Sequence, residues 1–133
     1  MAERIKIIVI NGAMIIALCL LLFFGTTWWR MHTQFTLGEE ALGRGDFAGA
    51  VAGYESAIHM YIPFNTTIEK AARQLWGIAE ANERLGDVSR ALIAYRALRS
   101  AFYGVTWLKT PGTDWIARCD QKIAVLVPLQ RER

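Results

Sequence analysis

The sequence contains a long apolar run, Ile7 to Phe24, whose 18 residues include one polar side chain, Asn11. A helix of that length reaches about 27 Å, close to the roughly 30 Å hydrocarbon core of a bilayer. Trp28 and Trp29 follow where amphipathic rings favour the membrane–water boundary, and Arg30 is the first charge beyond them. The run therefore predicts one transmembrane helix, which constrains everything that follows it.

The competing interpretation of this run is a cleaved signal peptide, since a basic start precedes the apolar core. No Ala-x-Ala-like cleavage site follows Phe24, which favours the anchor. Arg4 and Lys6 precede the span and Arg30 follows it closely, so the positive-inside bias places the N-terminus in the cytoplasm. We expect a single-pass protein of the bacterial inner (cytoplasmic) membrane, with the remainder in the periplasm.

The remainder of the chain is long enough for one small domain. From Arg30 onward it has 13 Lys and Arg against 11 Asp and Glu, and the two signs are interspersed. No basic cluster interleaved with aromatic residues is present, so no nucleic-acid partner is expected. The predicted partners are the lipid bilayer and other membrane proteins.

Glycines and prolines divide this remainder into stretches whose apolar residues recur every three or four positions. Such spacing is typical of helices, and the domain is predicted to be all-α. The expected organisation is a membrane anchor over 1–32 with a span of about 7–27, a helical domain over 33–127, and a tail over 128–133 that starts where Pro128 ends the last helix. Gly25 to Thr27 is the one obvious place for a bend between anchor and domain.

Two segments of the domain echo each other at an offset of 41 residues. Gly45-Asp46 aligns with Gly86-Asp87, and each pair is followed by matching alanine and tyrosine positions. Glycine suits the backbone conformation of a tight turn, and aspartate caps the helix that follows. Each segment therefore predicts a hairpin of two antiparallel helices. The small residues Ala50 and Ala91 occupy matching positions where the helices approach, and the aromatic residues Tyr54 and Tyr95 fill the groove between them.

This pattern resembles the tetratricopeptide repeat over roughly residues 33–102, with an offset longer than the usual period of about 34. The resemblance implies two helical hairpins followed by a C-terminal capping helix. The first copy carries it at Leu37-Gly38, Gly45-Asp46-Phe47, Ala50, Tyr54 and Ala57, and the second at Gly86-Asp87, Ala91 and Tyr95.

The remaining helix boundaries have signals of their own. Thr66 and Glu69 form a Thr-x-x-Glu capping box, which predicts a helix from there to about Arg84. A loop is expected over about 103–112, before a last helix that starts at Thr113-Asp114. Its apolar face makes it the expected cap of the repeats; the face consists of Trp115, Ile116, Cys119, Ile123 and Leu126.

In the tetratricopeptide family the first helix of each hairpin lines a concave protein-binding groove. The family's carboxylate clamp is absent here, and an acidic and aromatic groove would suit an apolar or basic segment. Trp76 is either the anchor of this groove or a core residue between hairpins. The predicted groove residues are Phe35, Glu39, Leu42, Arg73, Trp76, Glu80 and Glu83. A second aromatic group either seals the core or forms another docking surface; its members are Phe102, Tyr103, Trp107 and Trp115.

The span itself has features that favour contact with another helix. Ala13 and Ala17 are small residues four positions apart, which lets helix backbones approach, and the Asn11 amide can find a partner across such an interface. Local water could also satisfy Asn11, because it lies only a short way into the span.

The catalytic inventory is poor. His32, His59, Cys19 and Cys119 are the only histidines and cysteines, and none of them shows metal-ligand spacing. No phosphate loop or serine elbow is present either. We expect no enzyme activity, no cofactor, no metal and no small-molecule substrate.

The expected function is a membrane-anchored adaptor, an accessory or assembly subunit of a multi-subunit membrane complex. The alternative is a receptor, similar in layout to the mitochondrial presequence receptor, whose helical domain binds amphipathic segments at the membrane surface. That alternative requires a cytosolic domain, so the membrane topology distinguishes the two.

Overall fold

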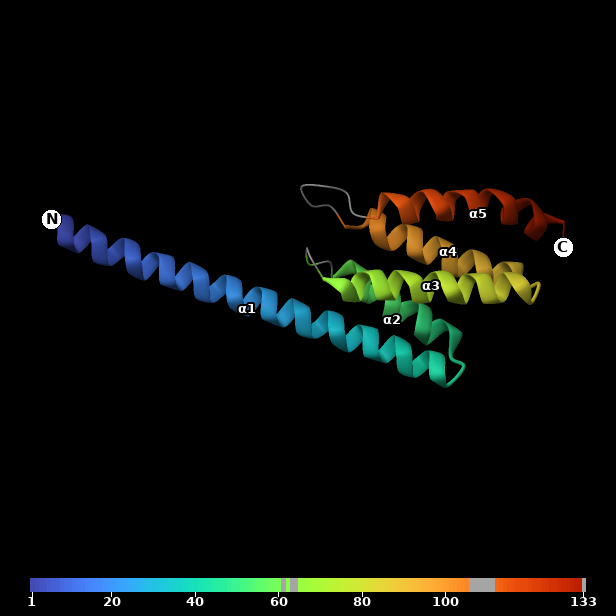
Figure 1. The fold of residues 1–133 in the computed structure, drawn as a ribbon, viewed down its shortest axis with the longest axis horizontal. Coiled ribbons are helices and arrows are strands. Elements are labelled where there is room, and N and C mark those ends of the chain that lie inside the picture. The colour runs from blue at the N-terminus through green and yellow to red at the C-terminus, as the bar shows by residue number, and fades with distance from the viewer. Residues whose placement is uncertain (61, 63–64, 106–111, 133) are drawn as a thin grey trace.

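The computed structural model describes residues 1–60, 62, 65–105 and 112–132, and the described residues form five α-helices without a strand (Figure 1). The all-α prediction is confirmed. Successive helices run antiparallel to one another (Figure 1). Their bounds are Ala2–Gly43 for α1, Phe47–His59 for α2, Thr66–Arg84 for α3, Val88–Tyr103 for α4 and Thr113–Arg131 for α5.

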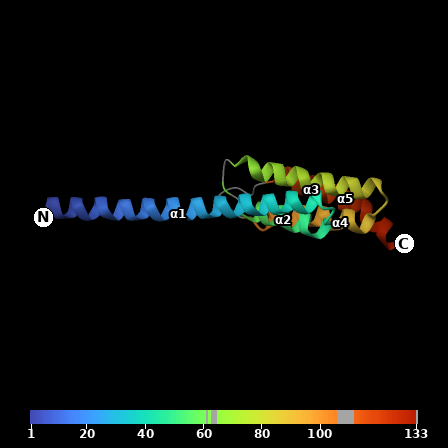
Figure 2. The same ribbon diagram turned by 90° about the horizontal axis from the view of Figure 1, so that it is seen from below.

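Helix α1 is continuous over 42 residues, which corresponds to about 63 Å. It does not break at Gly25, and the hydroxyls of Thr26 and Thr27 donate back to the carbonyls of Leu22 and Phe23. Its first half projects beyond the other helices (Figure 2) and is apolar and long enough to cross a membrane. The same helix therefore passes from the apolar run into the folded part of the chain.

The two predicted Gly-Asp turns have the same geometry. Gly45 and Gly86 both have positive φ, 72° and 77°, which glycine adopts at little steric cost. In each turn the next residue caps the following helix, because the Asp46 and Asp87 carboxylates accept hydrogen bonds from backbone N–H groups three residues later. The prediction of two helical hairpins, α1 with α2 and α3 with α4, is confirmed.

The closest approach within the first hairpin is made by two glycines. A Cβ added to Gly53 would lie 2.6 Å from both Cα and N of Gly38, so these two backbones touch. The aligned positions in the second hairpin are Ala79 and Ala94, both fully buried. Ala50 and Ala57 are also buried, as small residues of this interface were expected to be, but the glycine pair sets the helix separation.

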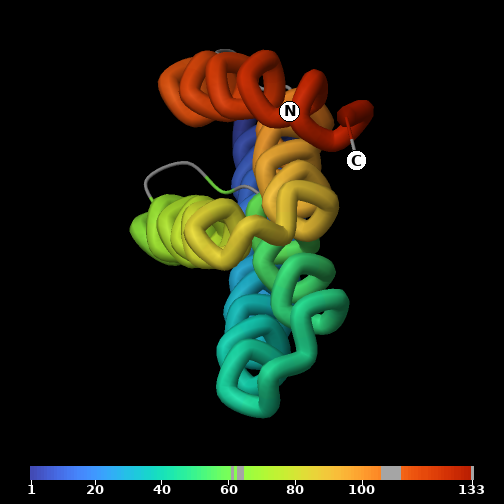
Figure 3. Tube along the Cα trace, turned by 90° about the vertical axis from the view of Figure 1, so that its right-hand side faces the viewer, coloured from blue at the N-terminus to red at the C-terminus, as the bar shows by residue number. Residues whose placement is uncertain are grey.

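The hydrophobic core runs through all five helices. It begins at Met31, two residues before the predicted domain boundary, and Met31 is fully buried. We call residues 31–131 the helical domain. Seen end-on, α2 lies against α1, α3 and α4, and α4 packs against both α3 and α5 (Figure 3). The largest fully buried side chains are Tyr54, Tyr95, Met31, Ile58, Leu75, Leu92, Leu98 and Cys119.

The predicted capping box at the start of α3 is wrong. Asn65 is the N-cap, and its side-chain oxygen accepts from the Thr67 N–H at 2.8 Å, so Thr66 is already helical. Glu69 is thereby released from capping. It accepts instead from the Trp115 indole N–H at 3.2 Å and ties α3 to α5.

The end of α5 also differs from expectation. The helix starts at Thr113 as predicted, but it continues through Pro128 to Arg131, so the predicted stop and most of the predicted tail are helical. A proline deprives the carbonyl four residues earlier of its donor. Here that residue is Ala124, which is exposed on the outer side of α5, so water can take the place of the missing donor.

Candidate interaction surfaces

Two of the predicted groove residues hold helices together within the domain. The Glu39 carboxylate accepts hydrogen bonds from the Tyr54 hydroxyl at 2.7 Å and the Gln74 amide at 3.0 Å, and so joins α1 to α2 and α3. The Phe35 ring packs edge-on against Tyr54, with 5.6 Å between centroids. Burial, followed by the contact with Glu39, raises the pKa of Tyr54. This side of α1 is therefore occupied by contacts with α2 and α3.

In the second hairpin Glu83 plays the part that Glu39 plays in the first, because it joins neighbouring helices by hydrogen bonds. Its carboxylate accepts from the Tyr95 hydroxyl at 2.7 Å and from the Lys122 ammonium at 3.1 Å, which links α3 to α4 and α5. Burial raises the pKa of Glu83, but the hydrogen bonds from Tyr95 and Lys122 and the charge of Lys122 together outweigh burial and lower it. Glu83 is therefore held ionised by its neighbours.

The lowered pKa of Glu83 predicts acid sensitivity. A carboxylate with a depressed folded-state pKa stabilises the fold above its unfolded pKa, and this stabilisation is lost as the pH falls from about 4.5 through the lowered value. We expect Lys122→Met to destabilise the domain at pH 7 and to reduce the further loss between pH 7 and about pH 3. Denaturant midpoints measured at both pH values test this.

The control for that measurement is Arg84→Met. Arg84 pairs with Glu80 at 3.6 Å on the surface of α3, where ion pairs contribute little. We expect Arg84→Met to leave the pH dependence unchanged. Equal pH profiles for Lys122→Met and the unmodified chain would contradict the assignment of the Glu83 shift.

Trp76 was predicted as either a groove anchor or a core residue, and its ring contacts support core packing. The indole packs against Tyr95 at 5.0 Å and against Trp115 at 6.0 Å between centroids, so it joins α3 to α4 and α5. It is half-buried. Trp76 is therefore part of the seam that holds the last helix in place.

The other predicted groove residues lie at the surface. Arg73 pairs with Glu69 at 3.8 Å, and both side chains are mostly exposed. Leu42 is 40% exposed and borders an apolar hollow between the two hairpins, where the Arg90 guanidinium lies 5.2 Å from the Phe47 ring centroid. This inter-hairpin hollow is lined by Leu42, Gly45, Asp46, Phe47, Ala50, Ile78, Ala81, Asn82 and Arg90. Sequence reasoning identified Leu42 but missed the hollow, because its lining comes from four helices.

The second aromatic group divides between core and surface. Phe102 and Trp115 are buried, as expected if the group seals the core. Tyr103 is half exposed, with the Arg99 guanidinium 4.8 Å from its ring centroid. Trp107 lies outside the described residues.

The predicted contact face of the span separates into two faces. Ala13 and Ala17 lie about 40° apart around α1, whereas Asn11 lies about 160° from Ala13, at about 100° per residue. Ala13 lines up with Met31, on the side of α1 that packs against the domain. All three side chains are exposed, so neither face is used within the described chain.

Between the apolar run and the core, α1 carries an exposed aromatic collar. Trp29 is 69% exposed, and Trp28 stacks on His32 with 5.1 Å between ring centroids. Arg30 is exposed beside them. A shallow surface depression continues from this collar along α1; its lining is Trp28, Trp29, His32, Thr33, Thr36, Leu37 and Glu40.

The outer face of α5 was not anticipated. A capping helix is expected to present a polar outer face, yet Val125 is 63% exposed and Leu129 is 44% exposed. Ala117, Ala124 and Pro128 are exposed on the same side. Gln121, Val125 and Leu129 are four residues apart, which places them on one side of the helix. Only the apolar stripe that packs against the domain was predicted from the sequence.

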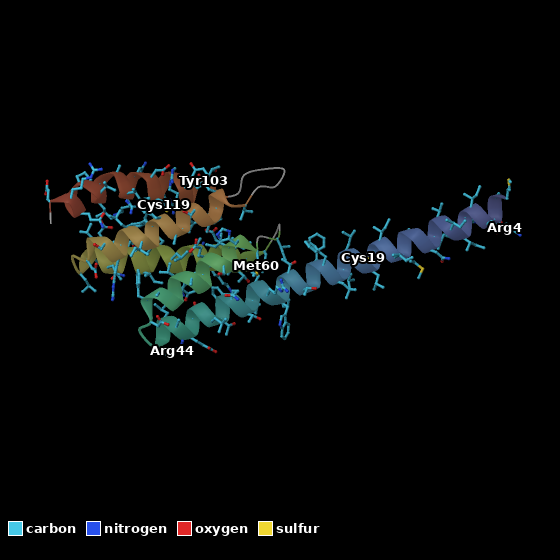
Figure 4. The ribbon with its side chains drawn as sticks, turned by 180° about the vertical axis from the view of Figure 1, so that it is seen from behind. Arg4, Cys19, Arg44, Met60, Tyr103 and Cys119 are labelled. Atoms are coloured by element: carbon cyan, nitrogen blue, oxygen red, sulfur yellow. The ribbon has the colours of Figure 1, made fainter. Side chains whose placement is uncertain are left out.

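The two histidines and two cysteines differ in their surroundings: Cys19 is exposed on α1, and His32 stacks on Trp28. His59 lies 3.7 Å from Glu55 one turn away. Cys119 lies on α5 (Figure 4) and is fully buried, and burial raises the pKa of its thiol to about 12. Among the described residues, no three or more His, Cys, Asp or Glu side chains are grouped to hold a metal ion.

The burial of Cys119 predicts that its thiol is unreactive in the folded protein. At pH 8 almost none of it is thiolate, and the thiolate is the reacting form. We expect a maleimide to label Cys119 only after denaturation, in a chain carrying Cys19→Ala. Rapid labelling of the folded chain, followed by mass spectrometry, would contradict the buried position.

The described surfaces therefore comprise the inter-hairpin hollow, the aromatic collar, the two faces of the apolar half of α1, and the outer face of α5. Each is positioned by a helix that also contributes to the core. Comparison with protein-family models, with curated proteins and with solved structures finds no significant match for this chain.

Proposed function

We propose that this protein is a single-pass adaptor of the bacterial inner membrane, an accessory or assembly subunit that binds other subunits of a membrane complex. The observation that carries the proposal is the continuity of α1, which runs without a break from the apolar half to the buried Met31. A helix without a hinge places the domain at a set height and orientation on the membrane. Such placement suits a subunit that contacts a neighbour in the same bilayer.

The domain in this proposal is tetratricopeptide-like and periplasmic. Three features support the likeness: the two Gly-Asp turns share one geometry, each second helix buries a tyrosine at the aligned position, and each tyrosine donates to a glutamate of the first helix of its own hairpin. The charge bias around the span supports the periplasmic side, with Arg4 and Lys6 before it and Arg30 after it. Domains of this kind bind proteins, and we propose no enzymatic activity.

The inter-hairpin hollow is the proposed contact for the partner subunit. The glutamates of the predicted groove are engaged within the chain, which leaves an apolar contact at Leu42 and Phe47 as the better-supported mode. We expect Leu42→Asp to weaken binding of the partner by about tenfold, as loss of a buried apolar contact does at interfaces. Leu85→Asp is the matched control, because Leu85 is 82% exposed and lies outside the lining of the hollow.

The test is co-purification of the full chain from native membranes in a mild detergent. We expect other membrane proteins to be recovered with the unmodified chain and with Leu85→Asp, and to be depleted with Leu42→Asp. Recovery of this chain without any other protein would overturn the proposal.

A second version of the experiment tests the continuity of α1. A flexible Gly-Ser linker inserted between Thr27 and Trp28 leaves the anchor and the domain intact but separates their motions. We expect it to abolish co-purification, whereas the same linker inserted after Ala2 has no effect. Undiminished co-purification with the first insertion would show that rigid placement is irrelevant.

A receptor that binds amphipathic segments is the second candidate, and the exposed apolar face of α5 favours it. It requires the domain to be cytosolic. Gln121→Cys, in a chain carrying Cys19→Ala, provides an exposed thiol on the domain, since Cys119 is buried. Labelling by a membrane-impermeant maleimide from the periplasmic side supports the adaptor, and protection from it supports the receptor.

A further inference from the structure

Helix α1 is exposed on all sides along the apolar run, and one of its faces carries Asn11. The residues of this face are spaced alternately three and four positions apart, the spacing that keeps a seam toward a neighbouring helix. This outer stripe lies about 180° from Met31 and Gly38, which face the domain. Every residue in it is exposed (the same half of α1 carries Cys19 in Figure 4). The outer stripe consists of Ile8, Asn11, Ile15, Leu18, Leu22, Gly25 and Trp29.

Asn11 is the only polar side chain of the apolar run, and it stands on this stripe. The hydroxyls of Thr26 and Thr27, near the end of the span, are satisfied by carbonyls of their own helix. Within the described chain the Asn11 amide has no such partner. An unsatisfied amide in hydrocarbon is costly, so Asn11 needs either water from the nearby membrane surface or a partner on a second helix. A helix partner would also cover the apolar residues on the same face.

We propose that two copies of this chain pair in parallel through their outer stripes. The inference rests on the membrane anchoring proposed above. On a twofold axis each residue meets its counterpart in the other copy. Asn11 then lies opposite the same residue of the second copy, and because an amide both donates and accepts, the two side chains satisfy each other. Apolar residues and Gly25 meet their own kind along the rest of the stripe.

Membrane topology selects this face over the exposed face of α5. Copies inserted in the same direction can be related only by a twofold axis along the membrane normal. Helix α5 runs roughly along α1 (Figure 1), so pairing through α5 would be parallel too and would place Asp114 against Asp114 of the second copy. The outer stripe carries no charge between Ile8 and Trp29.

Beyond the span the pairing need not continue. Thr33 and Thr36 extend the stripe into the domain, and both hydroxyls donate to their own helix. Glu40 would approach its counterpart, but in water this repulsion is weak. The domain lies on the opposite side of α1, so two domains would face outward from the pair without clashing.

The test is cysteine crosslinking of the full chain in native membranes, in a chain carrying Cys19→Ala. Leu18→Cys and Leu22→Cys place a thiol on the stripe, and Ile16→Cys and Leu20→Cys place it on the opposite face. We expect mild oxidation to produce a disulfide-linked dimer of this chain for the first two variants, at least tenfold more than for the other two. Equal crosslinking of both faces, crosslinks to other proteins only, or no crosslinks would overturn the pairing.

Carbonate extraction of the same membranes separates failure of the pairing from failure of the anchor. A chain that resists extraction but gives no stripe-specific dimer leaves the anchor standing and removes the pairing, whereas release of the chain by carbonate removes both. Asn11→Leu supplies a further readout. We expect it to weaken dimerisation in micelles, measured by energy transfer, by about tenfold, and Asn11→Gln to restore it. An unchanged affinity for Asn11→Leu would contradict the role of the amide.

Discussion

Gly53→Ala is expected to lower the free energy of unfolding by about 2–3 kcal/mol, the cost of overpacking a tight interface. In most helices this substitution stabilises, because alanine has the higher helix propensity. Here the new methyl group would lie 2.6 Å from the backbone of Gly38 and 2.9 Å from the carbonyl oxygen of Gln34. Backbone atoms cannot rotate aside, so α1 and α2 must separate. Chemical denaturation of the full chain in mild detergent, followed by circular dichroism, measures the effect.

Gly77→Ala is the matched control for that experiment. Gly77 is an interior residue of α3, and a Cβ there would meet nothing within 4 Å. We expect it to raise the free energy of unfolding by about 0.5–1 kcal/mol through helix propensity alone. A stabilising or neutral effect of Gly53→Ala would show that the two helices are further apart than the structure describes.

Trp76→Ala is expected to destabilise the domain by about 3 kcal/mol, toward the lower end for removing a buried tryptophan because the ring is half-buried. The substitution removes the ring that packs between Tyr95 and Trp115, and α5 loses part of its seat on α3 and α4. Denaturant unfolding measures the free energy of unfolding of each variant. Near-ultraviolet circular dichroism should report the changed environment of Trp115.

Trp29→Ala controls for the loss of a tryptophan as such, because Trp29 is largely exposed and outside the core. It should leave the unfolding midpoint of the domain unchanged. If Trp76→Ala also left it unchanged, Trp76 would have to be reconsidered as a binding residue. If Trp76→Ala abolishes partner binding, its measured stability distinguishes an unfolded domain from the loss of a binding residue.

The turns between helices could be predicted from the sequence because their determinants are local. Gly45-Asp46 and Gly86-Asp87 each contain both the residue that adopts positive φ and the residue that caps the next helix. The prediction of a capping box at Thr66, also based on local sequence, was wrong. Asn65 and Thr66 both suit an N-cap. The capping box required Glu69 to bond at the start of its own helix, but its partner Trp115 lies 46 residues away.

The candidate site was predictable only in part, because charged side chains bind partners that are distant in the sequence. Glu39 and Glu83 were identified as groove residues, but nothing near them in sequence announces Gln74 or Lys122 as partners. Likewise, helical spacing identified Leu42 without showing that four helices enclose a hollow beside it. The grouping of Asn11 with Ala13 failed for a simpler reason: residues two apart on a helix lie on nearly opposite faces.

The unbroken first helix bears on how tightly a partner can bind. Association is opposed by the rotational freedom that both molecules lose, and preorganisation reduces that loss. A domain on a flexible tether would retain most of this freedom before binding. Only six residues, about 10 Å of helix, lie between Phe24 and the buried Met31, so the proposed anchor already sets the height of the domain and limits its tilt relative to the bilayer. A modest contact area can then support a stable complex, since the membrane has ordered the binding face beforehand.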